Sequence, residues 1–239
     1  MSTYNNETIG ISAEKFLCDI YNVECTIEPH RYNNEFIERL YHSNTLELLE
    51  NNNISIVQHI GKNNGSIDFK IYTEHGEATL SLKTLKKFTG KIAPQGGQPT
   101  YKSFDIKRDL AHQTRNLGRV QANTIRFNWL KDNIGDFLNE MQANTFCCDV
   151  TLLISNCSNN PRAIILRNRN YNFNNINITY SRSTYIELPH PRRPPPATSE
   201  FSCTVYGVIN GETKSIGEFQ FHKNSRQQVK FRFHSTLFH

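Results

Sequence analysis

The sequence predicts an α/β fold in which amphipathic helices come first, a small β-sheet follows, and the C-terminal portion is rich in strands. Two helical patterns open the chain, and three short segments then change the apolar period from about 3.6 to about 2. From about residue 146 onward, strand-like segments alternate with turn residues. The fold class follows from the order of these patterns.

The two N-terminal helices are expected at residues 11–23 and at about 34–51. Both segments place apolar side chains three and four residues apart, as one buried face of a helix requires. Glu14 lies in the first helix beside a polar stripe. A helix in this position can bring the Glu14 carboxylate next to the sheet.

Three strands are expected next, and together they predict the nucleus of a sheet. They cover residues 54–60, 66–73 and 78–84. His75 and Gly76 are expected to form a two-residue turn between the second and third strands.

The remaining chain is predicted as a long loop, two helices and a series of strands. The polar Gly/Gln/Pro segment 87–103 is expected to remain a loop, and residues 189–196, PHPRRPPP, to form an exposed polyproline-like connection. Asn210 and Gly211 predict a tight hairpin turn. The expected helices are about 104–118 and 124–141, and the expected strands are 148–154, 162–167, 176–180, 201–209, 216–222 and 229–233.

Composition and length indicate a globular protein of one elaborated domain. The chain has 239 residues, of which 37% are hydrophobic and 21% charged. No apolar run approaches the roughly 18 residues of a spanning helix, and the start MSTYNNETIG lacks the apolar core of a secretory signal. We therefore expect a cytoplasmic protein whose six cysteines are reduced.

Charge is distributed unevenly along the chain. Residues 1–160 hold 16 Lys and Arg against 18 Asp and Glu, whereas residues 161–239 hold 11 against 4. A basic segment of this kind is typical of a nucleic-acid binder, although a merely solvated basic face has the same composition. We therefore expect residues 146–239 to form a basic recognition portion beside a core at 1–145.

One acid and one lysine are expected to meet in the predicted hairpin. If His75 and Gly76 form the turn, Asp68 lies directly opposite Lys83, and Ser81 shares their face because strand side chains alternate. Phosphodiester hydrolysis needs an acid that holds a divalent cation and a lysine that assists the attacking water. The backbone carbonyl of Leu82 is a further candidate metal ligand. The alternative is an ordinary exposed cross-strand ion pair.

The residues that follow favour a nucleic-acid substrate over that alternative. Lys86 and Lys87 add positive charge after Lys83, and the polar loop brings Gln95 and Gln98. Cations bind phosphates and amides read base edges in DNA grooves, so these four side chains are predicted DNA contacts.

At this point the chain resembles the small type II restriction endonucleases of the PD-(D/E)xK superfamily, especially four-base cutters with a non-acidic residue before x-Lys. Ser81 is in that position, where the usual motif has Glu or Asp. The stretches that carry the resemblance are AEKFLCDIY (13–21), SID…LSLK (66–83), ILRNRN (165–170) and EFQFHKNSRQQVKFRF (218–233).

The resemblance implies a restriction-endonuclease-like fold, with a central mixed sheet flanked by helices, and Mg²⁺ as cofactor. It assigns the metal-binding acid to Asp68, the catalytic lysine to Lys83 and the helical acid to Glu14. Asp105 and Asp109 are competing donors of the second acid, since related enzymes sometimes move this acid to a later helix.

Near the C-terminus, cationic residues lie on or between two predicted strands, where a two-stranded ribbon can enter the major groove. The candidate DNA contacts there are His222, Arg226, Lys230 and Arg232.

The expected function is therefore sequence-specific, Mg²⁺-dependent cleavage of double-stranded DNA, and the resemblance implies products with 5′-phosphate ends. A DNA methyltransferase that protects the same site is the expected partner, and the enzyme is a monomer or a homodimer. Two alternatives remain open: a repair or structure-specific nuclease on the same fold, and a non-catalytic DNA-binding protein derived from a nuclease.

Overall fold

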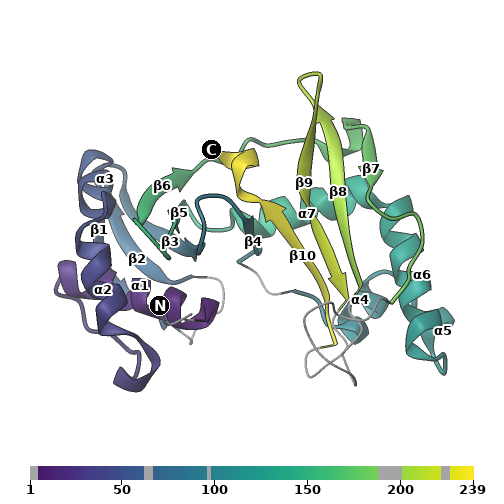
Figure 1. Ribbon diagram of the computed structural model, residues 1–239, viewed down its shortest axis with the longest axis horizontal. Coiled ribbons are helices and arrows are strands. Elements are labelled where there is room, and N and C mark those ends of the chain that lie inside the picture. The colour runs from purple at the N-terminus through teal and green to yellow at the C-terminus, as the bar shows by residue number, and fades with distance from the viewer. Residues whose placement is uncertain (1–4, 62–66, 96–97, 188–200, 222–226) are drawn as a thin grey trace. The chain divides into compact units, whose positions relative to one another are not determined.

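The computed structural model describes residues 5–61, 67–95, 98–187, 201–221 and 227–239, and the chain forms two compact units (Figure 1). The first unit comprises Met1–Gly96, Asn144–Arg169 and Ser235–His239, and the second comprises Gly97–Ala143 and Asn170–His234. The structure thus divides the chain differently from the expected boundary at residue 146. The expected polyproline-like segment 189–196 lies outside the described residues.

Three helices of the first unit confirm the N-terminal helical patterns: α1 (Asn6–Ile20), α2 (Asn34–Tyr41) and α3 (Thr45–Asn51). The single helix expected at 34–51 is interrupted between α2 and α3. Ser43 explains the break, because its hydroxyl donates to the Leu40 carbonyl at 2.6 Å and so competes with helical backbone bonding. A 3₁₀ turn at Pro29–Arg31 connects α1 to α2.

The sheet of the first unit is mixed, as expected. Its strands are β1 (Ser55–His59), β2 (Phe69–Thr73), β3 (Gly76–Thr84), β5 (Val150–Ser155) and β6 (Arg162–Leu166), in the order β1-β2-β3-β5-β6. Only the β3–β5 pair within this sheet is parallel. The short strand β4 (Lys91–Ile92) lies in the segment that was expected to be a loop throughout.

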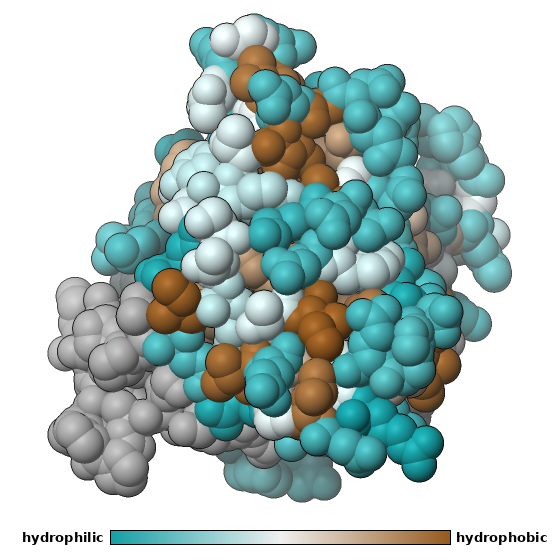
Figure 2. Space-filling model, turned by 90° about the vertical axis from the view of Figure 1, so that its right-hand side faces the viewer, coloured by the Kyte–Doolittle hydropathy of each residue, from teal (hydrophilic) through white to brown (hydrophobic). Residues whose placement is uncertain are grey.

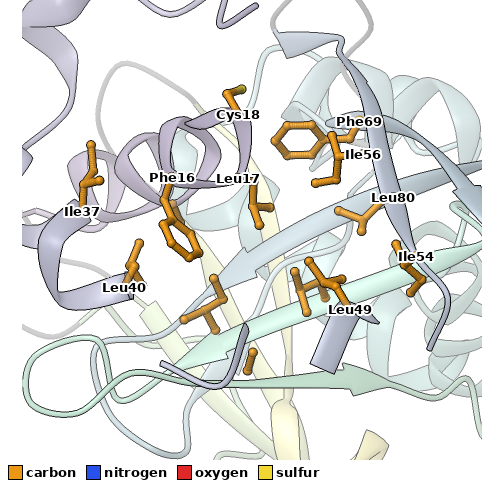
Figure 3. Packing of buried hydrophobic residues seen from close by; sticks show 14 of the residues in the cluster. Phe16, Leu17, Cys18, Ile37, Leu40, Leu49, Ile54, Ile56, Phe69 and Leu80 are labelled. Atoms are coloured by element: carbon orange, nitrogen blue, oxygen red, sulfur yellow. The ribbon is translucent and has the colours of Figure 1, made fainter. Parts of the chain in front are cut away.

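Apolar side chains from the helices and from one face of the sheet form the core of the first unit (Figure 3). Phe16 and Leu17 of α1 and Leu40 of α2 pack with Ile56 of β1 and Leu80 of β3. Because strand side chains alternate, Ser81 and Lys83 project from the opposite face of β3. The core therefore fixes which face of the sheet carries polar groups.

The register of the β2–β3 hairpin corrects the prediction by two residues. Phe69 pairs with Leu80 and Thr73 with Gly76, so Glu74 and His75 form the turn in place of His75 and Gly76. Asp68 consequently lies opposite Ser81 rather than Lys83. A shift of two residues leaves every side chain on its predicted face, whereas a shift of one would have reversed them.

The second unit contains helices α4 (Tyr101–Lys107), α5 (Ala111–Thr114), α6 (Arg119–Asp132) and most of α7 (Ile134–Thr145). Each of the two expected helices is divided into two. Asp109, with φ +53°, separates α4 from α5, and Asn133, which caps α6 through a bond to the Trp129 carbonyl, separates α6 from α7.

An antiparallel sheet completes the second unit, in the order β10-β9-β8-β7. Its strands are β7 (Ile178–Tyr180), β8 (Phe201–Ile209), β9 (Glu212–Phe221) and β10 (Val229–His234). The predicted turn is confirmed, since Ile209 pairs with Glu212 and both Asn210 and Gly211 have positive φ, +53° and +79°. Aromatic rings of Phe127, Phe201 and Phe221 pack edge to face in this unit.

The surface in Figure 2 is mainly hydrophilic, and its apolar patches are separate from one another. Exposed apolar side chains of the second unit include Ile106, Leu117, Val120 and Val208. Scattered exposed apolar residues are normal on globular surfaces. Within the described residues, no helix is long and apolar enough to cross a membrane.

Candidate active site

Asp68 and Lys83 come together at the polar face of the first sheet. Asp68 precedes β2, and its backbone N–H donates to the Leu80 carbonyl at 3.1 Å. Its carboxylate accepts a 2.6 Å bond from the Leu82 N–H. Ser81, fully buried, and Lys83 lie on the neighbouring strand with their side chains on the same face. The structure thus brings together the three side chains that were predicted to converge.

Gln95 joins these three side chains. Its Oε1 accepts bonds from Ser81 Oγ at 2.8 Å and from Lys83 Nζ. Its Nε2 donates to both carboxylate oxygens of Asp68, each at 3.1 Å. The backbone N–H of Gln95 donates to the Asn144 carbonyl at 3.0 Å, which anchors the segment that carries it. This residue was predicted as a DNA contact, and the structure places it between the acid and the lysine.

Burial shifts the pKa values of Asp68 and Lys83, the two ionisable residues among these four side chains. Desolvation raises the pKa of Asp68, and the negative charge of Glu14 adds to this effect, while the Leu82 N–H, Lys83 and Gln95 oppose it. Desolvation lowers the pKa of Lys83, against the influence of Asp68 and of two nearby thiols. A carboxylate and an amine with pKa values moved toward neutrality are typical of functional sites.

The Glu14 carboxylate is held in place by His59. Glu14 Oε2 lies 3.0 Å from His59 Nε2, and the imidazole is completely buried. His59 Nδ1 accepts a bond from the Thr26 N–H at 3.2 Å, so Nε2 carries the proton and donates to Glu14. No role was predicted for His59 from the sequence. The only local signal was its position near the end of the strand expected at residues 54–60.

The residues of this cluster fit a hard divalent cation. Carboxylate and carbonyl oxygens are the ligands that Mg²⁺ accepts, and Asp68 supplies a carboxylate that lies close enough to Glu14 for their charges to interact. Two neighbouring carboxylates in a partly buried site repel each other, and a cation relieves that repulsion. The Leu82 carbonyl remains a predicted third ligand.

The two competing acids belong to the second unit. Asp105 is buried there, where Arg126 binds both of its carboxylate oxygens and Thr114 Oγ1 donates to it at 2.8 Å. Asp109 is exposed and faces His112 at 3.9 Å. Of the three candidate acids, Glu14 is the one that belongs to the same unit as Asp68.

A second group of potential ligands lies near Glu14. Cys18, Cys25 and His59 place ligand atoms within 4.8 Å of one another, and they are the only such group of three or more within the described residues. Both nitrogens of His59 already bond to Thr26 and Glu14. Burial also raises the pKa of Cys18, which keeps this thiol protonated. We therefore interpret the group as reduced, packed side chains.

The predicted DNA contacts have different environments. Lys87 is exposed and Lys86 partly buried. The side-chain amide of Gln98 donates to the Phe231 carbonyl at 2.8 Å and accepts from the Phe231 N–H at 2.7 Å. This side chain therefore stabilises the backbone of β10.

The predicted C-terminal ribbon is part of a larger sheet, because β10 pairs with β9 and β9 with β8. Arg232 forms an ion pair with Glu218 across β9 and β10, at 3.1 Å, and Lys230 is partly buried. His222 and Arg226 lie outside the described residues.

Comparison with known proteins gives one informative similarity. No family model matches the chain. The chain is 29% identical over 234 residues to the type II restriction enzyme CviAII of Paramecium bursaria Chlorella virus 1. This alignment covers 95% of the chain but 57% of that enzyme. The chain thus spans a little over half the length of the curated relative it matches.

Proposed function

We propose that this chain is a type II restriction endonuclease with a restriction-endonuclease-like fold, which hydrolyses phosphodiester bonds of double-stranded DNA at a specific sequence. The observation that carries the proposal is the proximity of Asp68, Lys83 and Glu14 beside a mixed sheet. Similarity to a type II restriction enzyme over 95% of the chain supports it. The order of Asp68, Ser81 and Lys83 along the sequence, with Ser81 where the motif has an acid, would make this cluster a variant PD-(D/E)xK site.

Each residue of the cluster has a defined part in the proposed reaction. Asp68 and Glu14, with the Leu82 carbonyl, would hold Mg²⁺, which supplies charge neutralisation at the scissile phosphate and acidifies a bound water. Lys83 is held near Asp68 and stabilises negative charge on the phosphate or assists removal of a proton from the water. The Leu82 N–H fixes the Asp68 carboxylate at 2.6 Å. His59 orients Glu14.

The second unit is the proposed DNA-recognition part. It contains 15 Lys and Arg against 9 Asp and Glu, whereas the first unit contains 12 against 13. Phosphate contacts depend on such positive charge. Lys86, Lys87 and Lys230 remain proposed DNA contacts, as do His222 and Arg226. A DNA methyltransferase of the same specificity is the proposed partner of the enzyme.

The experiment that tests this function is incubation of the purified protein with unmethylated phage DNA, with and without Mg²⁺. Wild-type protein should give discrete fragments with Mg²⁺ and none without it. Asp68→Ala and Lys83→Ala should lower the cleavage rate by about 10³-fold or more. Glu77→Ala and Lys70→Ala, which remove exposed side chains of the same type from β3 and β2, should cleave as wild type does.

The other outcomes decide between the alternatives. Cleavage only at lesions or junctions would replace the proposal with a repair or structure-specific nuclease. DNA binding without cleavage at any Mg²⁺ concentration would favour a non-catalytic DNA-binding protein. Equal cleavage by wild type and Asp68→Ala would remove the cluster from the mechanism.

A further inference from the structure

Gln95 occupies the position in the cluster where an oxygen ligand is missing. Ser81 stands where the motif normally has an acid, and its hydroxyl is fully buried and donates to Gln95 Oε1 at 2.8 Å. The oxygen atom that faces both Ser81 and Lys83 thus comes from Gln95, which follows β4 in the sequence. The Gln95 side chain thus supplies an oxygen atom at the place where the motif normally has the carboxylate of residue 81.

The amide group of Gln95 binds the Asp68 carboxylate, which is the group expected to bind a cation. Its amide nitrogen donates to both oxygens of Asp68, and a cation held by both oxygens would use the lone pairs that face this N–H donor. A cation and an N–H donor cannot share the same lone pairs. Coordination of a cation by both oxygens of Asp68 would therefore require the Gln95 amide to leave this carboxylate.

The same movement affects Lys83. Gln95 Oε1 accepts from the Lys83 ammonium, so a turn of the amide group breaks that bond and frees the lysine. The amide oxygen then becomes available to the cation, and side-chain amide oxygens are established ligands of hard cations. The anchored backbone of Gln95, bonded to Asn144, keeps the side chain within reach.

We propose that Gln95 is a metal ligand of this site, and that its side chain, which binds Asp68 in the structure, supplies through its amide oxygen the ligand that Ser81 does not. The proposal rests on the proposed function for the nature of the site. It adds a residue from outside the sequence motif, and it links cation binding to release of Lys83.

The test is direct titration of the protein with Mn²⁺ in the absence of DNA, with free Mn²⁺ measured by electron paramagnetic resonance. Gln95→Ala should weaken Mn²⁺ binding by about tenfold, because one ligand is lost. Gln95→Glu should tighten it by about tenfold, because a carboxylate replaces a neutral oxygen. Gln58→Glu, which adds the same charge on the exposed side of β1, should bind as wild type does.

Unchanged or tighter binding by Gln95→Ala would overturn the proposal, since the amide would then be irrelevant or only a competitor of the metal. Absence of saturable Mn²⁺ binding by wild-type protein would also overturn it. If a variant fails to fold, ¹⁵N-glutamine-labelled wild type gives a second measurement with Mg²⁺. The side-chain amide signals of Gln95, assigned from whichever variant folds, should shift while those of Gln58 remain in place, and an unshifted Gln95 signal contradicts the proposal.

These readouts are independent of DNA cleavage. Mn²⁺ binding that depends on Gln95, without cleavage of any DNA, would contradict the proposed function and leave the ligand assignment intact. Mg²⁺-dependent cleavage by wild type, combined with unchanged metal affinity in Gln95→Ala, would contradict the ligand assignment alone.

Discussion

At the scale of single residues, the position of the Glu14 carboxylate depends on a buried histidine. His59 bonds to Glu14 through one nitrogen and to Thr26 through the other, so the imidazole has one orientation and one tautomer. Partners of this kind commonly fix the direction in which a metal-binding carboxylate points. We therefore interpret His59 as a residue that positions Glu14 in the proposed site.

His59→Ala should weaken Mn²⁺ binding and lower the rate of DNA cleavage, each by about 10- to 100-fold. His59→Gln keeps an N–H donor near the position of Nε2 and should recover part of both losses. The measurements are metal titration and initial cleavage rates, with thermal unfolding as a check on stability. Equal metal affinity in all three proteins would show that His59 only fills the core.

Sequence reasoning located Asp68, Ser81 and Lys83 but not the residues that join and orient them. The first three follow from strand alternation, which is a local property and survives a register error of two residues. Gln95 and His59 depend on where a loop and a strand end lie in three dimensions. No local pattern encodes that placement, so Gln95 was assigned to DNA and His59 to no function.

At the scale of elements, one carboxylate fastens the parallel pair of strands next to the cluster. Asp149, directly before β5, accepts bonds from the backbone N–H and the hydroxyl of Thr79 in β3, at 2.8 and 2.7 Å. These hydrogen bonds lower the pKa of Asp149. The ionised carboxylate therefore stabilises the start of the β3–β5 pair.

Because the folded-state pKa of Asp149 is depressed, its contribution to stability is present above the unfolded-state pKa of about 3.9. The contribution should disappear as the pH falls through the lower, folded-state pKa. Asp149→Asn should therefore lower the free energy of unfolding at pH 7 and flatten its pH dependence between about pH 5 and pH 2. Urea unfolding across that range measures both effects, and Glu77→Gln, an exposed carboxylate on β3, serves as the control. Parallel pH profiles for wild type and Asp149→Asn would contradict this assignment.

Element types were predictable where the apolar period is regular, and boundaries were not. The expected helices at 34–51, 104–118 and 124–141 are each divided in the structure. The breaks occur at short polar residues, Ser43, Asp109 and Asn133, which offer the backbone alternative hydrogen bonds or adopt left-handed φ. An apolar repeat continues across such a residue, so the pattern alone does not reveal the break.

At the scale of the whole molecule, positive charge is concentrated in the second unit. That unit has 15 Lys and Arg against 9 Asp and Glu, although its residues come from two separate parts of the chain. The charge contrast was predicted for residues 161–239, whereas the second unit includes α4 to α6 as well as the C-terminal strands. This distribution was not visible in a linear count, because it depends on which segments fold together.

DNA binding in the absence of metal should weaken steeply with salt. Each lysine or arginine that neutralises a phosphate contributes about one unit to the slope of log affinity against log salt concentration. The double variant Lys102→Ala, Arg115→Ala removes two exposed cations of the second unit and should reduce the slope by about 2. Lys70→Ala, on the exposed side of β2, should leave it unchanged. Equal slopes for all three proteins would place the DNA elsewhere.

The parallel pairing of β3 and β5 in the first unit affects the expected folding kinetics. The two strands pair with Leu80 beside Val150, and most of the intervening residues belong to the second unit. Joining two strands so distant in sequence costs loop entropy before their contacts stabilise the chain. Any compaction of residues 97–143 shortens that loop, so we expect early structure in the second unit to accelerate assembly of the sheet that carries Asp68 and Lys83.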